Sequence, residues 1–337
     1  MTNGARADGL QALAGLVDEF ACALPQSRLT PVLSRLRRPV RVAVDGRSGV
    51  GRRTVATVLH RRGVTVASTG ERADLRVMVI AEALKPEDRA MLETDVETVI
   101  VLNKADLSGS AAGGAMANAV RRAVEVRALT GVPTVPMVGL LAEAAVDDEL
   151  DGELVDALRT MVTAPADLTS VDAFASVEHP VDRGVRERLL ERLDRFGVAH
   201  AVVALARGAD PADLPKLFDD VSNVAAVLAQ LRQAAAPIRY RRVRAALAEL
   251  SSLTVEFDDP RLSGLLSSDP VVLATMTAAV EVVEADGLTV DARDGANAHM
   301  RRATRWQRYG EGPVNALHRQ CSADIVRGSL RLLDGPP

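Results

Sequence analysis

Residues 41–54 read Arg-Val-Ala-Val-Asp-Gly-Arg-Ser-Gly-Val-Gly-Arg-Arg-Thr and predict a strand, a glycine-rich loop and the start of a helix. Apolar residues lead into the loop, and a run compatible with a helix continues to residue 62. The spacing Gly46-x4-Gly51 fits a phosphate-binding loop, in which backbone N–H groups and a helix N-terminus cradle phosphates. We therefore expect a nucleotide-type site at the end of the first strand.

The two positions after Gly51 depart from the usual phosphate-binding loop. A Lys is expected where Arg52 stands, and a Ser or Thr where Arg53 stands. Arg52 can still neutralise phosphate through a bulkier guanidinium, whereas Arg53 cannot ligate Mg²⁺. Thr54 is placed to bond an α-phosphate, or to hold the metal if the loop shifts by one residue. The candidate phosphate-binding residues are Gly46, Ser48, Gly49, Val50, Gly51, Arg52, Arg53 and Thr54.

These replacements favour nucleotide binding with little or no hydrolysis. Mg²⁺ neutralises the charge that develops in phosphoryl transfer, so loss of its hydroxyl ligand removes the main stabiliser of the reaction. Slow hydrolysis and complete loss of nucleotide binding are the two alternatives. No catalytic residue and no metal ligand is assigned, and the role of Mg²⁺ stays open.

Asn103-Lys104-Ala105-Asp106 gives the sharpest indication of a ligand. It matches Asn-Lys-x-Asp, in which the Asp carboxylate accepts hydrogen bonds from the ring N1–H and exocyclic amine of guanine. The Lys stem lies along the base, and the Asn ties this segment to the phosphate-binding loop. The motif follows an apolar strand and uses one of only three lysines in the chain, so chance is a poor explanation. GDP or GTP is the expected ligand.

Three further positions bear on the same site. Gly139-Leu140 follows the last predicted strand, where a GTP-binding domain places a backbone N–H on guanine O6. Ala67, before Ser68-Thr69-Gly70, stands where the Asp of an Asp-x-x-Gly motif would anchor Mg²⁺. Only Gly63 separates the first helix from the second strand, which leaves no room for a long first switch loop. The Ala at position 67 and the missing switch loop each remove a part of the hydrolytic machinery.

Strands and helices alternate in the first half of the chain, which predicts an α/β fold with a doubly wound parallel sheet. From about residue 147 helical periodicity takes over and predicts a second, all-α domain. The expected domains are 1–38, N-terminal helices that pack with the C-terminal helical domain, 39–146, nucleotide-binding, and 147–337, all-α. Expected strands are 40–46, 64–67, 75–80, 98–102 and 135–138; expected helices are 9–24, 28–37, 86–92, 116–130, 150–163, 182–197, 211–218, 221–235, 237–253, 269–285, 291–308 and 313–333, with Pro237 as a break.

Composition narrows the class of protein. The chain has 337 residues, 47% hydrophobic and only 2% aromatic, so its core must be built from Ala, Val and Leu. A net charge of -4 gives no general electrostatic case for nucleic acid. Two distant cysteines and no apolar run of about 18 residues predict a cytoplasmic protein, with peripheral membrane contact left open. The five histidines are not spaced as metal ligands would be. The Arg cluster around Tyr240 favours a solvated helix face. Trp306 and Tyr309 are expected to stabilise a helix–helix contact.

The order of these motifs resembles the translation-factor-like class of P-loop GTPases. The leading helices, Arg38-Pro39-Val40 running into the loop, and the large helical second half resemble bacterial dynamin-like GTPases, especially the actinobacterial kind that includes the isoniazid-inducible proteins. The resemblance implies guanine-nucleotide binding, a helical bundle built from both chain ends, and membrane remodelling. It also implies homo- or hetero-association with a related dynamin-like GTPase, peripheral to the inner face of the plasma membrane. The altered loop makes this chain a degenerate member, or pseudo-GTPase.

Two other interpretations use the same residues. Val-Asp-Gly-Arg-Ser-Gly-Val-Gly also resembles the opening of uridine-kinase-like small-molecule kinases, in which Asp45 would lie near the phosphates. That interpretation leaves residues 103–106 unexplained. The third is a helical interaction protein on a relict P-loop fold that no longer binds nucleotide.

Overall fold

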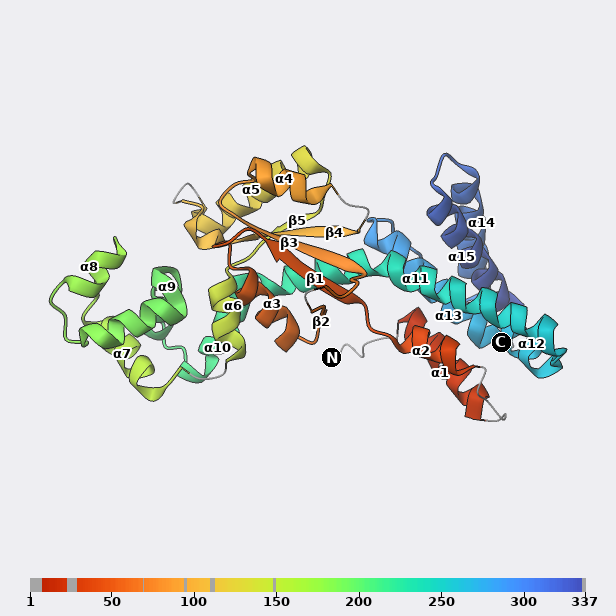
Figure 1. Cartoon of the computed structure of the whole chain (residues 1–337), viewed down its shortest axis with the longest axis horizontal. Coiled ribbons are helices and arrows are strands. Elements are labelled where there is room, and N and C mark those ends of the chain that lie inside the picture. The colour runs from red at the N-terminus through yellow and green to blue at the C-terminus, as the bar shows by residue number, and fades with distance from the viewer. Residues whose placement is uncertain are drawn as a thin grey trace. The chain divides into compact units, whose positions relative to one another are not determined.

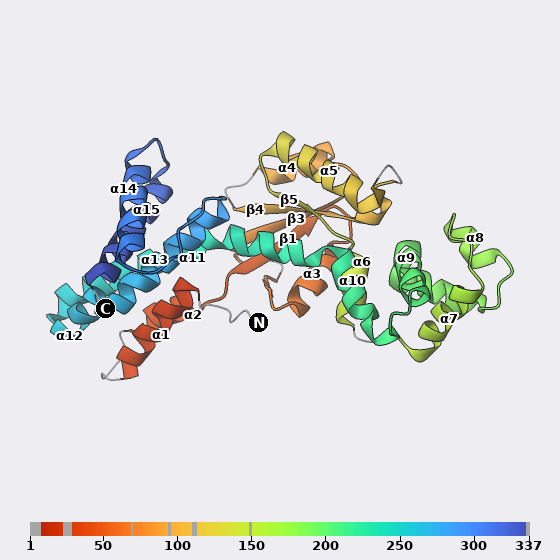
Figure 2. The same ribbon diagram turned by 180° about the vertical axis from the view of Figure 1, so that it is seen from behind.

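The computed structural model describes residues 8–22, 29–68, 70–93, 96–109, 113–147 and 150–334 (Figure 1, Figure 2). It divides into two compact units. The sheet unit is Arg41–Leu231, and the helical unit combines the residues up to Val40 with those from Arg232 onward. The division at residue 231 differs from the predicted domain boundary between residues 146 and 147.

A five-stranded parallel sheet forms the centre of the sheet unit, as the α/β prediction requires. The strands are β1 (Arg41–Gly46), β2 (Thr65–Val66), β3 (Leu75–Ala81), β4 (Thr98–Asn103) and β5 (Thr134–Pro136), in the order β2-β1-β3-β4-β5. Every residue of β4 is buried, and so are the first six of β3. Near-continuous apolar strands of this kind are typical of a parallel sheet covered on both faces.

Helices cover both faces of the sheet. In both views α4 (Pro86–Leu92) and α5 (Gly114–Thr130) lie on one side, and α3 (Arg52–Arg61) and α6 (Gly139–Val146) lie on the other (Figure 1, Figure 2). This arrangement is the doubly wound one that the alternation of strands and helices predicts. The strands end close to the expected residues, apart from β5, which begins one residue early and ends two residues early.

Four more helices continue the sheet unit beyond residue 147. They are α7 (Gly152–Thr163), α8 (Val171–Ser176), α9 (Arg183–Ala206) and α10 (Leu214–Ser222). Buried side chains of these helices, such as Leu158, Leu189 and Phe218, belong to the same hydrophobic core as Met78 and Ile100 of the sheet. These helices share one core with the sheet through α6, which contacts both α9 and α10, and this is why the two units do not separate at residue 147.

The helical unit is built from both ends of the chain. Its helices are α1 (Gly9–Cys22), α2 (Thr30–Arg37), α12 (Pro260–Ser267), α13 (Asp269–Ala285), α14 (Ala296–Glu311), α15 (Ala316–Asp334) and most of α11 (Val224–Phe257). A single core joins Leu13 and Val17 of α1 to Val282 of α13 and Trp306 of α14. Residues 23, 24 and 28 of the two predicted N-terminal helices lie outside the described residues.

The prediction of a helix break at Pro237 was wrong. Helix α11 runs without interruption from Val224 to Phe257 with Pro237 inside it. A proline removes one intrahelical hydrogen bond and crowds the preceding turn. Ala236, Tyr240 and Val243 are buried in the core of the helical unit. Packing on this face outweighs the local cost, which sequence periodicity alone does not reveal.

The arginines around Tyr240 are mostly engaged, contrary to the prediction of a solvated helix face. Arg239 lies 3.1 Å from Glu281, Arg244 lies 3.2 Å from Asp324, and Arg242 donates to the Arg38 carbonyl oxygen. Tyr240 itself is buried and donates to Asp324 at 2.7 Å. Burial and the Asp324 charge raise the pKa of the Tyr240 hydroxyl far above its usual range.

Trp306 and Tyr309 lie edge to face on α14, with ring centroids 5.0 Å apart. The Tyr309 hydroxyl lies 2.6 Å from Nδ1 of His318 on α15, and the Ser322 hydroxyl of α15 donates to the Trp306 carbonyl oxygen. These contacts join α14 to α15, which is the kind of helix–helix contact that was predicted for Trp306 and Tyr309.

No single helix in the described part of the chain is long and apolar enough to cross a membrane. Helices α12 and α13, bent by 46° at their junction, meet the length and composition criteria only when taken together.

Candidate functional site

The strand order places a crevice at the end of β1. In a sheet of order 2-1-3-4-5 the chain leaves β1 and β3 in opposite directions, and ligands bind at the carboxyl ends of the strands at this switch point. The loop of residues 46–51, called the glycine loop below, follows β1 and leads into α3. Asn103 is the last residue of β4, residues 104–106 follow it, and Gly139 begins α6 after β5. The topology therefore brings the predicted segments to one edge of the sheet.

Backbone conformation in the glycine loop requires glycine at Gly51. This residue caps α3 with φ 84°, a left-handed conformation that side chains with a Cβ rarely adopt. A Cβ at Gly51 would also lie 2.2 Å from the Asn103 amide nitrogen. The loop thus combines a turn into a helix N-terminus with close contact to the Asn-Lys-x-Asp segment.

Asn103 connects three of the predicted segments. Its buried side chain donates from Nδ2 to the Val50 carbonyl oxygen at 2.9 Å, and Oδ1 accepts from the Gly139 N–H at 2.9 Å. One amide therefore satisfies a carbonyl of the glycine loop and the first N–H of α6. The predicted link between Asn103 and the loop is present, and the link to Gly139 is an additional one.

Lys104 and Asp106 lie at the surface beside this bridge. Lys104 is exposed and left-handed, with φ 56°, and Asp106 lies half-buried in the short 3₁₀ turn Ala105–Leu107. Burial raises the pKa of the Asp106 carboxyl, with a smaller contribution from the Asp194 charge, while the Lys104 charge lowers it. Leu140 is half-buried in the first turn of α6 rather than in a loop after β5.

The basic residues that follow the glycine loop, Arg52 and Arg53, lie in the first turn of α3. Nη1 of Arg52 lies 3.4 Å from the Gly46 carbonyl oxygen, so this side chain folds back along the loop. Arg53 and Ser48 are exposed, and Thr54 is half-buried. Two arginines within one turn of the α3 N-terminus reinforce the positive end of the helix dipole, a combination that favours an anion.

Two ion pairs beside the loop were missed by sequence reasoning. Arg47 donates from Nε to Asp88 at 2.7 Å, and Arg76 of β3 donates from Nε to Asp45 at 2.9 Å. Arg76 stands in an otherwise apolar strand, and a charge in such a run indicates a buried partner. Asp88 follows Pro86 and Glu87 at the start of a helix, the pattern of an N-terminal cap. Both signals were available in the sequence.

The connection between α3 and β2 is short but has three residues, Arg62 to Val64, where the prediction had Gly63 alone. Gly63, with φ 81°, and Val64 turn the chain directly into Thr65, and the Ala67 N–H donates to the Val42 carbonyl oxygen at 2.9 Å. Ala67 therefore lies directly after β2 and has no side chain that could hold Mg²⁺. The Ser68 N–H donates a hydrogen bond to the Glu71 carboxylate. Thr69 lies outside the described residues.

Within the described ranges, no group of three or more His, Cys, Asp or Glu side chains is arranged to hold a metal ion. Comparisons of the chain with protein-family models, with curated proteins and with solved structures gave no match.

Proposed function

We propose that this chain is a degenerate G protein that binds GDP or GTP weakly, with little or no hydrolysis of GTP. The observation that carries the proposal is the Asn103 bridge, which joins the glycine loop to the start of α6 through two 2.9 Å hydrogen bonds. A solvated turn after a strand has no need for a buried amide with this pair of partners. The bridge holds a phosphate-type loop and a base-type loop at fixed separation.

Guanine recognition rests on Asp106 and Lys104. An ionised Asp106 accepts from the N1–H and exocyclic amine of guanine, whereas adenine presents no matching pair of donors. Lys104 is exposed beside it and supplies an aliphatic stem for the face of the base. The raised pKa of Asp106 adds a condition: binding weakens as the pH falls through that value, because the protonated acid is a poor double acceptor.

Phosphate binding rests on the N-terminus of α3 and on Arg52 and Arg53. Backbone N–H groups and guanidinium charge supply attraction for an anion. Arg53 and Ala67 occupy the positions of two Mg²⁺ anchors and can serve neither. We therefore assign to the chain nucleotide binding without efficient metal-assisted hydrolysis.

We further propose that the protein works by association, with another copy or with a related active dynamin-like GTPase, at the inner face of the plasma membrane. The support is architectural. The N-terminal helix α1 and the C-terminal helices α13 and α14 share one hydrophobic core, so both chain ends build one helical unit. This arrangement agrees with the helical bundle that the resemblance to dynamin-like proteins implies.

The test is a titration of the purified chain with fluorescent guanine and adenine nucleotides, with and without Mg²⁺. Asp106→Ala removes two hydrogen bonds to a charged acceptor and should weaken guanine binding by about 10- to 100-fold. Asp156→Ala, an exposed acid of the same unit, is the matched control and should leave the affinity unchanged.

Several results would contradict the proposal in different ways. Absence of binding, or preference for adenine, excludes a guanine site. GTP turnover that Asp106→Ala abolishes would identify a slow GTPase. Transfer of phosphate from ATP to a nucleoside would favour the uridine-kinase-like interpretation.

A further inference from the structure

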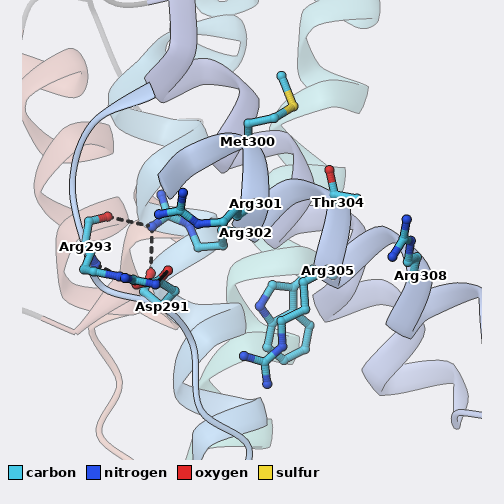
Figure 3. A pocket seen from close by; sticks show the side chains of 9 residues that line it. Asp291, Arg293, Met300, Arg301, Arg302, Thr304, Arg305 and Arg308 are labelled. Atoms are coloured by element: carbon cyan, nitrogen blue, oxygen red, sulfur yellow. Dashed lines mark hydrogen bonds and ion pairs between the residues drawn. The ribbon is translucent and has the colours of Figure 1, made fainter. Parts of the chain in front are cut away.

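A cavity of about 480 Å³ in the helical unit is lined mainly by arginines (Figure 3). Arg301, Arg302, Arg305 and Arg308 come from α14, and Arg293 and Asp291 come from the segment before it. Five arginines and one carboxylate thus line the cavity, in a chain whose overall net charge is -4. Such a local excess of positive charge needs a physical explanation.

Two of these arginines are held in place. Arg302 is buried, donates from Nε to the Ser329 hydroxyl at 2.9 Å, and donates from Nη1 to the Asp291 carbonyl oxygen at 2.7 Å. Arg293 binds the Asp291 carboxylate at two points, at 2.9 and 2.8 Å. The hydrogen bonds from Arg293 hold the pKa of the Asp291 carboxyl far below its usual range. The single acid of the cavity is therefore ionised and already paired.

The other three arginines lie on one face of α14. Arg301, Arg305 and Arg308 are spaced by four and three residues, which aligns their side chains along the helix. All three are exposed, and among the described residues none has a hydrogen-bond or ion-pair partner. Like charges at this spacing repel and destabilise the helix. A bound anion would relieve the repulsion.

We propose that this cavity binds a small anion that carries phosphate groups with at least two negative charges. The planar guanidinium fork matches the oxygens of a phosphate at two points, and arginine is the usual residue for that contact. The cavity volume is in the range of small-molecule sites. Arg302 and Arg293 form a fixed wall, because their guanidinium groups are already hydrogen-bonded. The exposed Arg301, Arg305 and Arg308 supply the positive charge for the anion. The site is separate from the glycine loop, and its existence does not depend on nucleotide binding there.

The chain contains its own reporter for this site. Trp306 is the single tryptophan of the sequence and lines the cavity. Its buried Nε1–H lacks a hydrogen-bond partner among the described residues, so a nearby anion should change its fluorescence. The first arm titrates the full chain with sodium tripolyphosphate at low ionic strength. The second arm titrates it with phosphatidylcholine vesicles that contain phosphatidic acid, which distinguishes a lipid headgroup from a soluble phosphate compound.

The decisive variant is R301Q/R305Q/R308Q, and R241Q/R261Q/R319Q removes the same charge from exposed positions that do not line the cavity. We expect saturable binding in at least one arm, a loss of affinity of about tenfold or more in the first variant, and wild-type affinity in the second. Circular dichroism checks that both variants fold. Absence of binding in both arms, or equal losses in the two variants, would overturn the proposal.

Discussion

Arg47 and Asp88 form a two-point ion pair, with Arg47 Nε 2.7 Å from Oδ1 and Nη2 3.3 Å from Oδ2 of the carboxylate. Asp88 is fully buried and also accepts from the Lys85 N–H at 3.0 Å, which caps the start of α4. Arg47 belongs to the glycine loop. The pair therefore fixes the loop to the helix that follows β3, in addition to the Asn103 bridge.

A double-mutant cycle measures the strength of this pair. Arg47→Ala leaves a buried carboxylate without its cation, and Asp88→Ala removes the α4 cap as well as the ion pair. Because Arg47 is partly exposed, we expect a coupling energy of about 1–3 kcal/mol, below the cost of breaking a fully buried pair. Urea unfolding of the single and double variants gives the value.

The control cycle uses Arg159 and Asp156, a pair 3.1 Å apart that is largely exposed. Its coupling should be about 0–1 kcal/mol. Equal coupling energies in the two cycles would show that Arg47 does not hold the loop.

Two glycines of the same loop separate backbone strain from steric contact. Gly49 and Gly51 both have φ 84°, but a Cβ at Gly49 would meet nothing within 4 Å, whereas one at Gly51 would lie 2.2 Å from Asn103 Nδ2. Gly49→Ala should cost about 1–2 kcal/mol from the left-handed conformation alone. Gly51→Ala should cost about 2–4 kcal/mol, since it also displaces a buried amide with two hydrogen-bond partners.

Thermal and urea unfolding of the two alanine variants check this difference. Asn103→Ala in the Gly51→Ala background removes the obstructing amide, so the added cost of Gly51→Ala should shrink there. If Gly49→Ala and Gly51→Ala lowered the free energy of unfolding equally, both with Asn103 and with Asn103→Ala, Asn103 would not constrain the loop.

Much of the sheet unit could be predicted from its local sequence. Apolar runs such as Leu75–Ile80 and Thr98–Leu102 form strands because only a buried parallel sheet satisfies such residues. The extent of this unit could not be predicted, because the helices after residue 147 have the same periodicity whether they pack on the sheet or on one another. The shared core of Ile100 and Leu189 is a property of tertiary packing.

The candidate site shows the same limit. Glycine spacing and the Asn-Lys-x-Asp pattern identified the loop and Asn103, since those residues act through short-range geometry. The ion pairs join separate segments of the chain: Arg47 lies in the glycine loop, Asp88 in α4 and Arg76 in β3. No periodic signal connects them. The arginines of α14 can be read in the sequence, but the cavity that they line with Asp291 and Trp306 is defined only by the fold.

Pro237 tests how packing overrides helix propensity. Pro237→Ala restores a backbone N–H in the middle of α11 and removes a steric conflict with the preceding turn. The gain is offset in part by the greater freedom of the unfolded chain, so we expect a net increase in stability of about 1–2 kcal/mol. Differential scanning calorimetry measures the change, with Ala245→Ser on the same helix as a control for substitution itself. A loss of stability would contradict the net cost that we assign to Pro237.

Asp106 should make stability depend on pH in a direction opposite to that of a salt-bridged acid. Burial raises its pKa in the folded state above the ordinary value of 3.8. The unfolded chain therefore loses the proton first as the pH rises. Folding stability should fall as the pH rises from 3.8 to the raised pKa, and the full penalty should be present above it.

Asp106→Asn removes this penalty, so the variant should be more stable than the wild type near neutral pH, and the difference should shrink as the pH falls toward 3.8. Its affinity for guanine nucleotide should fall at the same time, because the amide NH₂ meets a donor of the base. Urea unfolding across this pH range and nucleotide titration measure the two effects. Asp194→Asn removes a charge that helps to raise the pKa of Asp106. It should narrow the pH range over which stability changes, and it leaves the proposed contact with the guanine base intact. A stability difference that is independent of pH would contradict the burial of the Asp106 charge, and would leave guanine recognition to be judged on binding alone.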